Sequence, residues 1–269
     1  MTDAIANILS IAGSDPSGGA GIQADLKTFA ARRTYGMAVL TALTAQNTQG
    51  VSGVNSVPPA FVAAQIADVF SDVRVDAVKI GMIASAQIAE AVASALSPHR
   101  RVPVVLDPVM VAKGGASLLA REAVEALTHR LLPLATVLTP NLPEAAALLG
   151  EPEATDRAGM EDQARRLRAL GPKAVLLKGG HLPGSESPDV LATAEGAFWF
   201  EGVRILTRNT HGTGCSLSSA IAAELGKGRR LADAVAAAKG FIAGAVRHSD
   251  RLAVGSGHGP LHHFHALWD

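Results

Sequence analysis

The sequence predicts an α/β fold with a mainly parallel central sheet that is flanked by helices. Short apolar runs alternate with longer amphipathic stretches along most of the 269 residues, and this alternation is typical of repeated strand–helix–strand units. Hydrophobic residues make up 48% of the chain, while aromatic residues make up only 4%. The core therefore consists mostly of small aliphatic side chains, which suit helices packed closely on a buried parallel sheet.

The first half of the chain alternates strands and helices. Apolar runs mark the strands, and apolar residues three and four positions apart mark the helices, as Ile22, Leu26 and Phe29 do. Pro58 stands near the start of one helix, where proline is tolerated. In chain order we expect a strand over 5–12, a helix over 21–33, a strand over 37–44, a helix over 58–70, a strand over 77–80, a helix over 85–96 and a strand over 104–106.

The second half continues the pattern and adds a hairpin. A Glu195-Gly196 turn separates two short apolar runs, which predicts antiparallel strands over 190–193 and 197–200. We also expect helices over 120–131, 143–149, 160–170, 214–225 and 231–248, and strands over 136–138 and 174–177. The polar loops over 151–159 and 183–188 are too short to be domain linkers, so we expect a single domain over residues 1–269.

Charge and hydropathy exclude several kinds of partner. The chain has 24 basic and 24 acidic residues and no Lys- and Arg-rich run, so we expect no nucleic-acid partner. No apolar run reaches the roughly 18 residues of a membrane span, and the first residues lack the basic region of a signal peptide. Cys215 is the only cysteine, which excludes an internal disulfide and favours a cytoplasmic setting.

Polar residues recur where the predicted strands end. In an open parallel sheet, ligands bind beyond the carboxyl ends of the strands. We therefore expect these residues to converge on one site. They are Gly13 to Asp15, Gln46 with Asn47, Gly81 with Met82, Asp107, Asn141 with Glu144, and Lys178.

The first glycine-rich segment, residues 13–21, lies between a predicted strand and a predicted helix. It contains four glycines in nine residues, which would let the backbone approach a ligand closely. It has neither the G-x-G-x-x-G spacing of a dinucleotide fingerprint nor the Gly-Lys-Ser/Thr of a P-loop. A tight strand–helix turn without a ligand is the alternative interpretation.

The second glycine-rich segment contains Gly212, Thr213, Gly214 and Cys215 and opens an apolar helix. Free amides and the helix dipole at such a position favour an anion, such as a phosphoryl group in transfer. The same position favours a thiolate, so Cys215 is a candidate base or nucleophile. The alternative is a buried cysteine that acts as a small hydrophobic residue.

Four further polar residues each have two interpretations. Asn141 and Glu144 stand three apart at a predicted helix start, where they would form a cap or hold Mg²⁺ through its waters. Asp107 either caps a turn or belongs to the site. Lys178 stands before two glycines and either ends a strand in solvent or binds phosphate.

Histidines cluster near the end of the chain, at positions 258, 262, 263 and 265. Few carboxylates or thiols accompany them, so we expect packing and hydrogen bonding there rather than a metal site. His181 and His211 flank the glycine-rich segments and are weaker candidates for ligand contacts.

Together these segments resemble the hydroxymethylpyrimidine/phosphomethylpyrimidine kinases. The resemblance runs in the right order through nearly the whole chain and rests on residues 11–29 (IAGSDPSGGAGIQADLKTF), 44–48 (TAQNT), 79–82 (KIGM), 106–110 (LDPVM), 139–144 (TPNLPE), 178–181 (KGGH), 210–215 (THGTGC) and 259–265 (GPLHHFH). A small departure lies at residues 113–117 (KGGAS), where a serine commonly follows the lysine.

The resemblance implies a ribokinase-like fold without a separate lid domain, usually as a homodimer. It implies two ATP-dependent phosphorylations at one site, first of the hydroxymethylpyrimidine and then of its monophosphate, for thiamine biosynthesis. Mg²⁺ would be the cofactor.

The resemblance also implies roles for single residues. Gln46 and Met82 would contact the pyrimidine, with Gly13 and Asp25 nearby. Cys215 takes the place of the aspartate base of sugar kinases. Catalysis would involve Gly212, Gly214 and Lys178 besides Cys215; Asp107, Lys178, Thr213 and Asn141 would bind nucleotide or phosphate; and Glu144 with Asn141 would hold Mg²⁺ through water.

Three other functions compete with this interpretation. A pyridoxal- or pyridoxamine-type vitamin kinase would share the fold and the reaction. A non-catalytic pyrimidine-binding module would keep the pocket without turnover. A thiol-nucleophile transferase would form a covalent adduct on Cys215.

Overall fold

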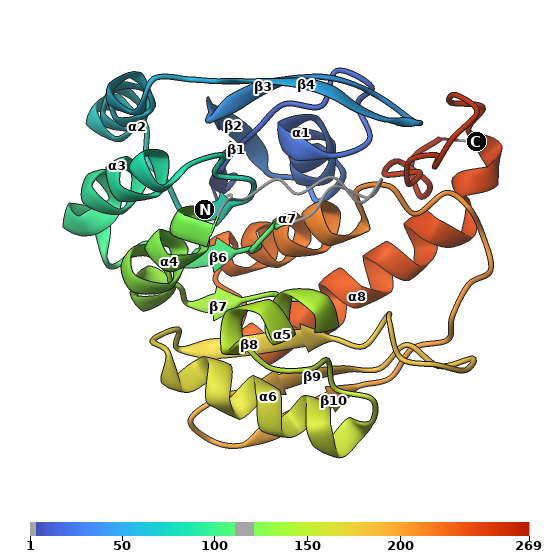
Figure 1. The fold of residues 1–269 in the computed structure, drawn as a ribbon. Coiled ribbons are helices and arrows are strands. Elements are labelled where there is room, and N and C mark those ends of the chain that lie inside the picture. The colour runs from blue at the N-terminus through green and yellow to red at the C-terminus, as the bar shows by residue number, and fades with distance from the viewer. Residues whose placement is uncertain (1–3, 111–120, 269) are drawn as a thin grey trace.

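The computed structural model describes residues 4–110 and 121–268, whose central feature is an eight-stranded sheet (Figure 1). The strand order is β10-β9-β8-β7-β6-β5-β1-β2. β1 (Asn7–Ala12), β2 (Tyr35–Leu40), β5 (Ala77–Ile80), β6 (Val104–Leu106), β7 (Val137–Leu138) and β8 (Ala174–Lys178) pair in parallel. β9 (Asp189–Ala192) and β10 (Ala197–Phe200) form the predicted antiparallel hairpin at one edge.

Helices cover both faces of this sheet. α2 (Pro59–Asp72), α3 (Ala86–Leu96), α4 (Arg121–Ala126), α5 (Leu142–Leu149) and α6 (Arg157–Ala169) pack on one face, and α1 (Gly21–Ala31), α7 (Thr213–Gly226) and α8 (Leu231–Arg247) pack on the other. Successive strand residues alternate between the two cores: Leu9 and Ile11 join the first and Ile8 the second. A sheet covered on both faces favours near-continuous apolar strands, as the apolar runs in the sequence predicted.

The predicted strand over 37–44 is wrong in one respect, because the chain changes sheets within it. β2 ends at Leu40, and β3 (Ala42–Asn47) pairs instead with β4 (Gly50–Ser56) in a separate antiparallel sheet. Thr41 between them is buried, and its hydroxyl donates to the carbonyl of Met82 over 2.7 Å. An apolar run in the sequence does not show where the chain leaves one sheet and enters another. The separate sheet, and with it β4, was therefore not predicted.

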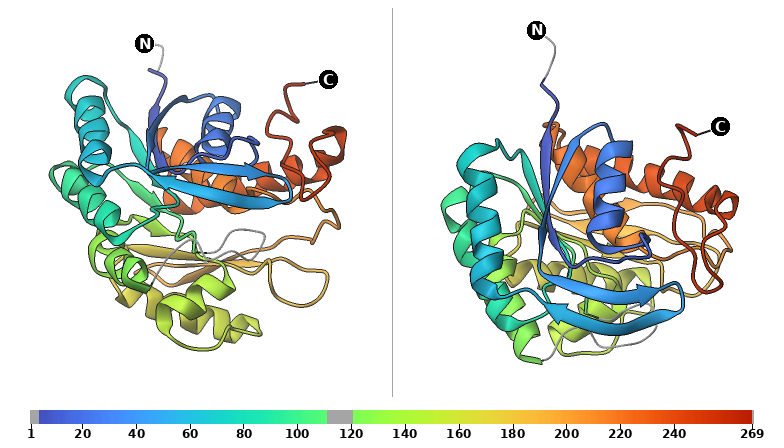
Figure 2. Two further views of the ribbon diagram at one scale, coloured as in Figure 1. Left: turned by 45° about the horizontal axis from the view of Figure 1, so that its top comes forward. Right: turned by 90° about the horizontal axis from the view of Figure 1, so that it is seen from above.

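The β3–β4 hairpin, in blue in Figure 2, lies outside the main sheet. Among the described residues, β3 and β4 are the only strands outside it, and no separate lid domain is present. Gln46 therefore reaches the site from this hairpin and not from a main-sheet strand.

The helix predicted over 120–131 consists of α4 and a π-helical segment, Leu127–Leu131. Its first residue, Ala120, and the whole 113–117 segment lie outside the described residues. None of the helices in the described part of the chain has the length and hydropathy to cross a bilayer.

Candidate active site

A cavity of about 1310 Å³ opens at the carboxyl ends of the parallel strands. Its wall combines loops that follow five of these strands with the last residue of β8 and the first turn of α7. It brings together the predicted residues Gly13, Gln46, Met82, Asp107, Asn141, Glu144, Lys178, Gly212, Thr213, Gly214 and Cys215. Asp25 is the one predicted residue that does not line it.

Two helices begin at the same point of the cavity. α1 starts at Gly21 and α7 at Thr213, and the Gly21 amide lowers the pKa of the Cys215 thiol. The first amides of a helix have no partner within it, and the helix dipole adds positive potential there. This end of the cavity therefore suits an anion such as a phosphoryl group.

Glycines allow close approach at the start of α7. Gly212 has φ +77°, and a Cβ there would collide with the carbonyl oxygen of Gly19. A Cβ on Gly214 would lie 3.3 Å from Lys178 Nζ and 3.7 Å from Asp107 Oδ2. Lys178 Nζ also donates to Asp107 Oδ1 over 3.3 Å. A lysine cation thus stands directly beside the helix amides.

Burial acts on the Cys215 thiol against the thiolate that its helix position favours. Burial raises the pKa of Cys215 to about 11, and the nearby Lys79 cation offsets only part of this effect. Asp107 and Asp25 raise the pKa further, while the Gly21 amide lowers it. Desolvation and the two nearby carboxylates together outweigh the effect of the helix N-terminus on the thiol pKa. The local sequence does not show that these carboxylates lie near the sulfur.

The first glycine-rich loop, residues 13–21, surrounds its own carboxylate. Asp15 accepts hydrogen bonds from the amides of Ser17 and Ala20 over 2.9 and 2.8 Å, and His211 Nε2 lies 2.8 Å from its Oδ2. Burial opposes the charge of Asp15, but the hydrogen bonds from His211 and Ser17 outweigh it and lower the pKa to about 2. The amides of Ser17, Gly19 and Ala20 therefore donate to the Asp15 carboxylate and are not free to bind a phosphate.

A slot for a flat ring lies between this loop and the β3–β4 hairpin. Gln46 Nε2 is 3.4 Å from His211 Nε2, and Gln46 Oε1 accepts from Thr44 Oγ1 over 3.2 Å. Gly13 leaves room for the Met82 methyl group, because a Cβ at Gly13 would collide with it. An amide edge with one donor and one acceptor beside a thioether fits a polar heterocycle.

Asn141 and Glu144 form the helix cap that the sequence left as one of two alternatives. Asn141 Oδ1 accepts from the Glu144 amide, and Glu144 Oε2 accepts from the Asn141 amide, each over 2.8 Å. Burial raises the Glu144 pKa to about 7, an effect that Lys178 opposes and Asp107 reinforces. The cap occupies the Asn141 side-chain oxygen, whereas Glu144 keeps Oε1 for a further cation.

The acidic residues near Lys178 fit Mg²⁺ only together with a phosphate ligand. Within residues 4–110 and 121–268, no group of three or more His, Cys, Asp and Glu side chains is placed to hold a metal. Mg²⁺ in kinase sites takes one or two carboxylates, substrate phosphates and waters. A buried carboxylate such as Glu144, with its charge poorly compensated, meets that requirement.

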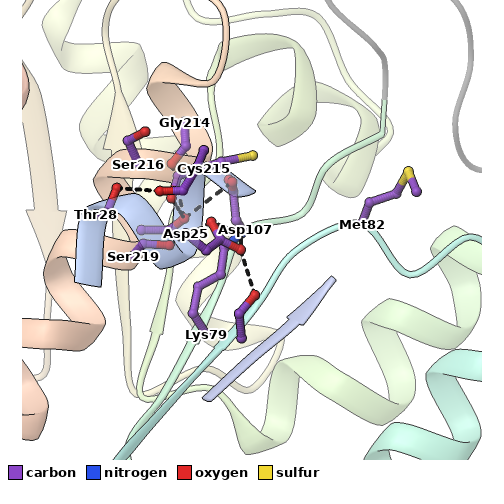
Figure 3. A network of polar contacts seen from close by, with 12 residues as sticks. Asp25, Thr28, Lys79, Met82, Asp107, Gly214, Cys215, Ser216 and Ser219 are labelled. Carbon is purple, nitrogen blue, oxygen red and sulfur yellow. Dashed lines mark hydrogen bonds and ion pairs between the residues drawn. The ribbon is translucent and has the colours of Figure 1, made fainter. Parts of the chain in front are cut away.

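Asp25, which the resemblance placed near the pyrimidine, lies beneath the cavity wall and does not line the cavity. Its carboxylate is fully buried and accepts from Lys79 Nζ over 2.9 Å at both oxygens. Figure 3 shows Asp25, Lys79, Ser219 and Cys215 in one cluster, with Met82 standing apart. The side chain is already saturated by neighbours from the protein.

Three residues that line the cavity received little weight from the sequence, namely Lys79, Asp15 and His211. Lys79 stands in a short strand whose four residues are all buried, and a charge in an apolar run was the available signal. Asp15 and His211 are 196 positions apart, so no local pattern indicated their pairing.

The rest of the cavity wall is more apolar. It includes Ala236, Gly240 and Ile242 of α8, with Val203 and Ile205 after β10, and it also carries the charged residues Asp189, Glu201, Arg204 and Lys239. The cavity therefore extends from the polar end to a wall of mixed apolar and charged residues, which leaves room for a bulky phosphorylated co-substrate.

Comparison with known proteins identifies the family. The family model described as phosphomethylpyrimidine kinase matches residues 15–262. The hydroxymethylpyrimidine/phosphomethylpyrimidine kinase of Escherichia coli is 55% identical over 97% of this chain and 98% of its own length. A bifunctional thiamine biosynthesis protein of Geobacter sulfurreducens is 53% identical over 98% of this chain and 53% of its own length.

Solved structures agree with this assignment. The ADP complex of Bacillus subtilis pyridoxal kinase has a TM-score of 0.89 and 38% identity, covering 98% of this chain and 99% of that one. A phosphomethylpyrimidine kinase from Clostridium difficile has a TM-score of 0.79 and 43% identity, covering 89% of this chain and 98% of that one. The expected fold class and family resemblance are thereby confirmed: the chain belongs to the phosphomethylpyrimidine kinase family and has a ribokinase-like fold.

Proposed function

We propose that this protein uses ATP to phosphorylate 4-amino-5-hydroxymethyl-2-methylpyrimidine and then its monophosphate, for thiamine biosynthesis. The observation that carries the proposal is the meeting of two helix N-termini and Lys178 beside Cys215, at the end of the cavity next to Gln46 and Met82. This arrangement supports a ring slot and a phosphoryl site within one cavity. The family membership supports the same reaction.

In the proposed complex, the Gln46 amide pairs with the aminopyrimidine edge, and Met82 covers the ring beside Gly13. The ring's hydroxymethyl group then reaches Cys215. Its oxygen attacks the γ-phosphorus of ATP, the bond from that phosphorus to the bridging oxygen breaks, and ADP leaves. The protonated thiol positions the hydroxyl by hydrogen bonding. The hydroxyl proton passes to an oxygen of the transferred phosphoryl group as the new bond forms, because a loose transition state needs little proton removal beforehand.

The charge on the transferring phosphoryl group is met by several groups of the protein. The amides of Gly212, Thr213 and Gly214 face one side and Lys178 another, with Asp107 orienting the lysine. Mg²⁺, when bound, neutralises phosphate charge, and Glu144 would hold it through Oε1 or a water. Asn141 contributes by fixing Glu144 through the cap, since its own side-chain oxygen is occupied.

A pyridoxal-type vitamin kinase is the second candidate. Several solved neighbours with TM-scores near 0.9 are pyridoxal kinases, including one from Staphylococcus aureus in complex with AMP-PCP and pyridoxal at a TM-score of 0.89. A pyridine with a hydroxymethyl arm would occupy the same slot. It lacks the amino group beside a ring nitrogen that Gln46 would pair with, so the pyrimidine is the preferred substrate.

We further propose that the protein acts in the cytoplasm as a homodimer of one domain over residues 1–269. The β3–β4 hairpin supports the dimer, since a two-stranded sheet is only marginally stable alone. Leu43 and Val54 in this hairpin are 48% and 49% exposed.

Product analysis tests the proposed function. The protein is incubated with ATP, Mg²⁺ and either the hydroxymethylpyrimidine or pyridoxal, and products are identified by mass spectrometry. We expect pyrimidine mono- and diphosphate from the first and far slower turnover with the second. Faster turnover of pyridoxal would favour the second candidate, and no phosphorylated product from either would indicate a binding module. Gln46→Ala should weaken pyrimidine binding by roughly 1–3 kcal/mol.

A further inference from the structure

A fully buried ion pair lies directly beneath the proposed catalytic cysteine. Lys79 of β5 and Asp25 of α1 both have side chains with 0% exposure, and Lys79 Nζ is 2.9 Å from each carboxylate oxygen. Lys79 nevertheless borders the cavity. A Cβ on Gly81, two residues further along, would come within 2.7 Å of the same Nζ.

Two serines attach this ion pair to the elements around the thiol. Ser10 of β1 donates to Asp25 Oδ2 over 2.6 Å, and Ser219 of α7 donates to Asp25 Oδ1 over 2.7 Å. Ser219 is four residues after Cys215, so it lies on the same face of α7 one turn later. Asp25 likewise stands four residues after Gly21, whose amide lowers the pKa of the Cys215 thiol.

The cluster therefore fixes the two helix starts that meet at the sulfur. Figure 3 shows Asp25 between Lys79 and Ser219, close to Cys215. Tying α1 to α7 through one carboxylate sets the position of the thiol relative to the Gly21 amide. A buried ion pair is often no more stabilising than a well-packed apolar pair, so stability alone does not explain its place under the cavity.

The cluster also sets the electrostatic potential at the sulfur. The charged groups that act on Cys215 are Lys79, Asp25, Asp107 and Lys178. Lys79 favours the thiolate, while Asp25 and Asp107 disfavour it. Removing Lys79 or Asp25 alone should therefore change the thiol acidity in opposite directions.

We propose that Lys79 and Asp25 are positioning residues for Cys215, which hold its sulfur between the starts of α1 and α7 and balance the charge around it. The proposal rests on the proposed role of Cys215 in phosphoryl transfer. It assigns to Lys79 a role through the thiol and not through contact with the nucleotide.

The test measures how fast iodoacetamide alkylates Cys215, the only cysteine in the chain. Lys79→Met should slow alkylation at pH 8.5, and Asp25→Asn should accelerate it, each by roughly three- to tenfold, because the thiolate fraction changes by about tenfold per pKa unit and its nucleophilicity offsets part of that. A purely structural role would not produce opposite signs. Rates that move in the same direction, or do not move while the fold is intact by circular dichroism, overturn the proposal.

A double variant that removes both charges keeps the proposal testable if one of the single variants fails to fold. Lys79→Met with Asp25→Leu removes both charges and the bond to Ser219. We expect alkylation within about threefold of wild type, since the opposing charges vanish together, but a kcat reduced by on the order of tenfold or more from misplacement of the hydroxyl. The pyrimidine KM should change little, and a wild-type kcat in this variant overturns the proposal.

Matched controls come from the other end of α7. Arg32→Met and Glu224→Gln disrupt a second ion pair with a buried carboxylate, one that touches neither the cavity nor Asp25. Both should leave alkylation and kcat near wild type. The alkylation readout does not depend on turnover, so an active Cys215→Ala protein would refute the catalytic role of the thiol without affecting this electrostatic result.

Discussion

At the scale of single residues, the helix position of Cys215 and its burial act on the thiol in opposite directions. Two helix N-termini point at Cys215, yet burial and two carboxylates raise its pKa to about 11. Asp107 acts on both the thiol and Lys178, so the phosphoryl site and the thiol share one carboxylate. In the proposed reaction Cys215 orients the hydroxyl, while helix amides and Lys178 meet the phosphoryl charge.

The first prediction concerns the pH dependence of this thiol. Alkylation of Cys215 should keep rising from pH 7 through pH 10 and should not level off near the pKa of about 8.5 of an ordinary cysteine. Intact-mass measurement of iodoacetamide labelling follows it, because no other cysteine is present. A plateau below pH 9 would mean that the helix amides prevail over burial.

A second prediction concerns Asp15. Its pKa falls from 3.8 to about 2 on folding, so its contribution to stability is complete above pH 3.8 and is lost as the pH falls through about 2. Asp15→Asn should lower the free energy of unfolding at pH 7 by roughly 1–3 kcal/mol, and the difference should shrink between pH 4 and pH 2. Urea unfolding at several pH values measures it.

The exposed Asp72→Asn provides the control for Asp15, since it changes the same group at a helix end on the surface. It should leave the free energy of unfolding nearly unchanged. An Asp15 difference that stays constant down to pH 2 would show that hydrogen bonding without charge explains the whole effect.

At the scale of elements, the start of α5 combines a structural and a chemical task. The reciprocal cap fixes Asn141 and Glu144 while bringing Glu144 within 4.0 Å of Lys178. A helix start after a parallel strand points into the site, so the residues that cap it also border the phosphate region.

The third prediction separates these two tasks. Glu144→Gln keeps an oxygen for the cap but removes the charge, so we expect Mg²⁺-dependent turnover to fall by on the order of tenfold or more while the melting temperature changes little. Calorimetry should show unchanged pyrimidine binding without nucleotide. Loss of that binding in a folded protein would move Glu144 to the pyrimidine half, and the exposed Glu153→Gln is the matched control.

At the scale of the whole molecule, the β3–β4 hairpin stands outside the main sheet and supplies Gln46 to the cavity (Figure 2). Its position thus affects the ring slot directly. Leu43 and Val54 expose apolar surface on this hairpin, and a partner that covered it would also steady Gln46.

The fourth prediction is a homodimer held in part by this hairpin. Light scattering at micromolar concentration should give twice the 27.5 kDa chain mass. Leu43→Glu with Val54→Glu should shift the mass toward one chain, because it places charges in the interface. Leu206→Glu, at a residue 92% exposed elsewhere, should not. A wild-type mass of a single chain contradicts the prediction.

The sequence by itself determined the alternation of strands and helices and several of the residues that line the polar end of the cavity. Apolar period and glycine placement are local properties, so the helix from Gly21 and the helix opened by Thr213 were predicted close to their observed bounds. The rule that strand ends converge then placed Asp107, Asn141 and Lys178 together before any coordinate was known.

Only the tertiary structure decided where β2 gives way to β3, and how Asp15, Asp25 and Cys215 behave. Asp15 meets His211 from 196 positions away, and Asp25 meets Lys79 from 54 positions away. Pairing and pKa depend on the groups that folding brings within a few ångströms and on the water that it removes. The local sequence shows neither the neighbouring groups nor the loss of water. The direction of the Cys215 pKa shift therefore followed from the fold and not from its helix position.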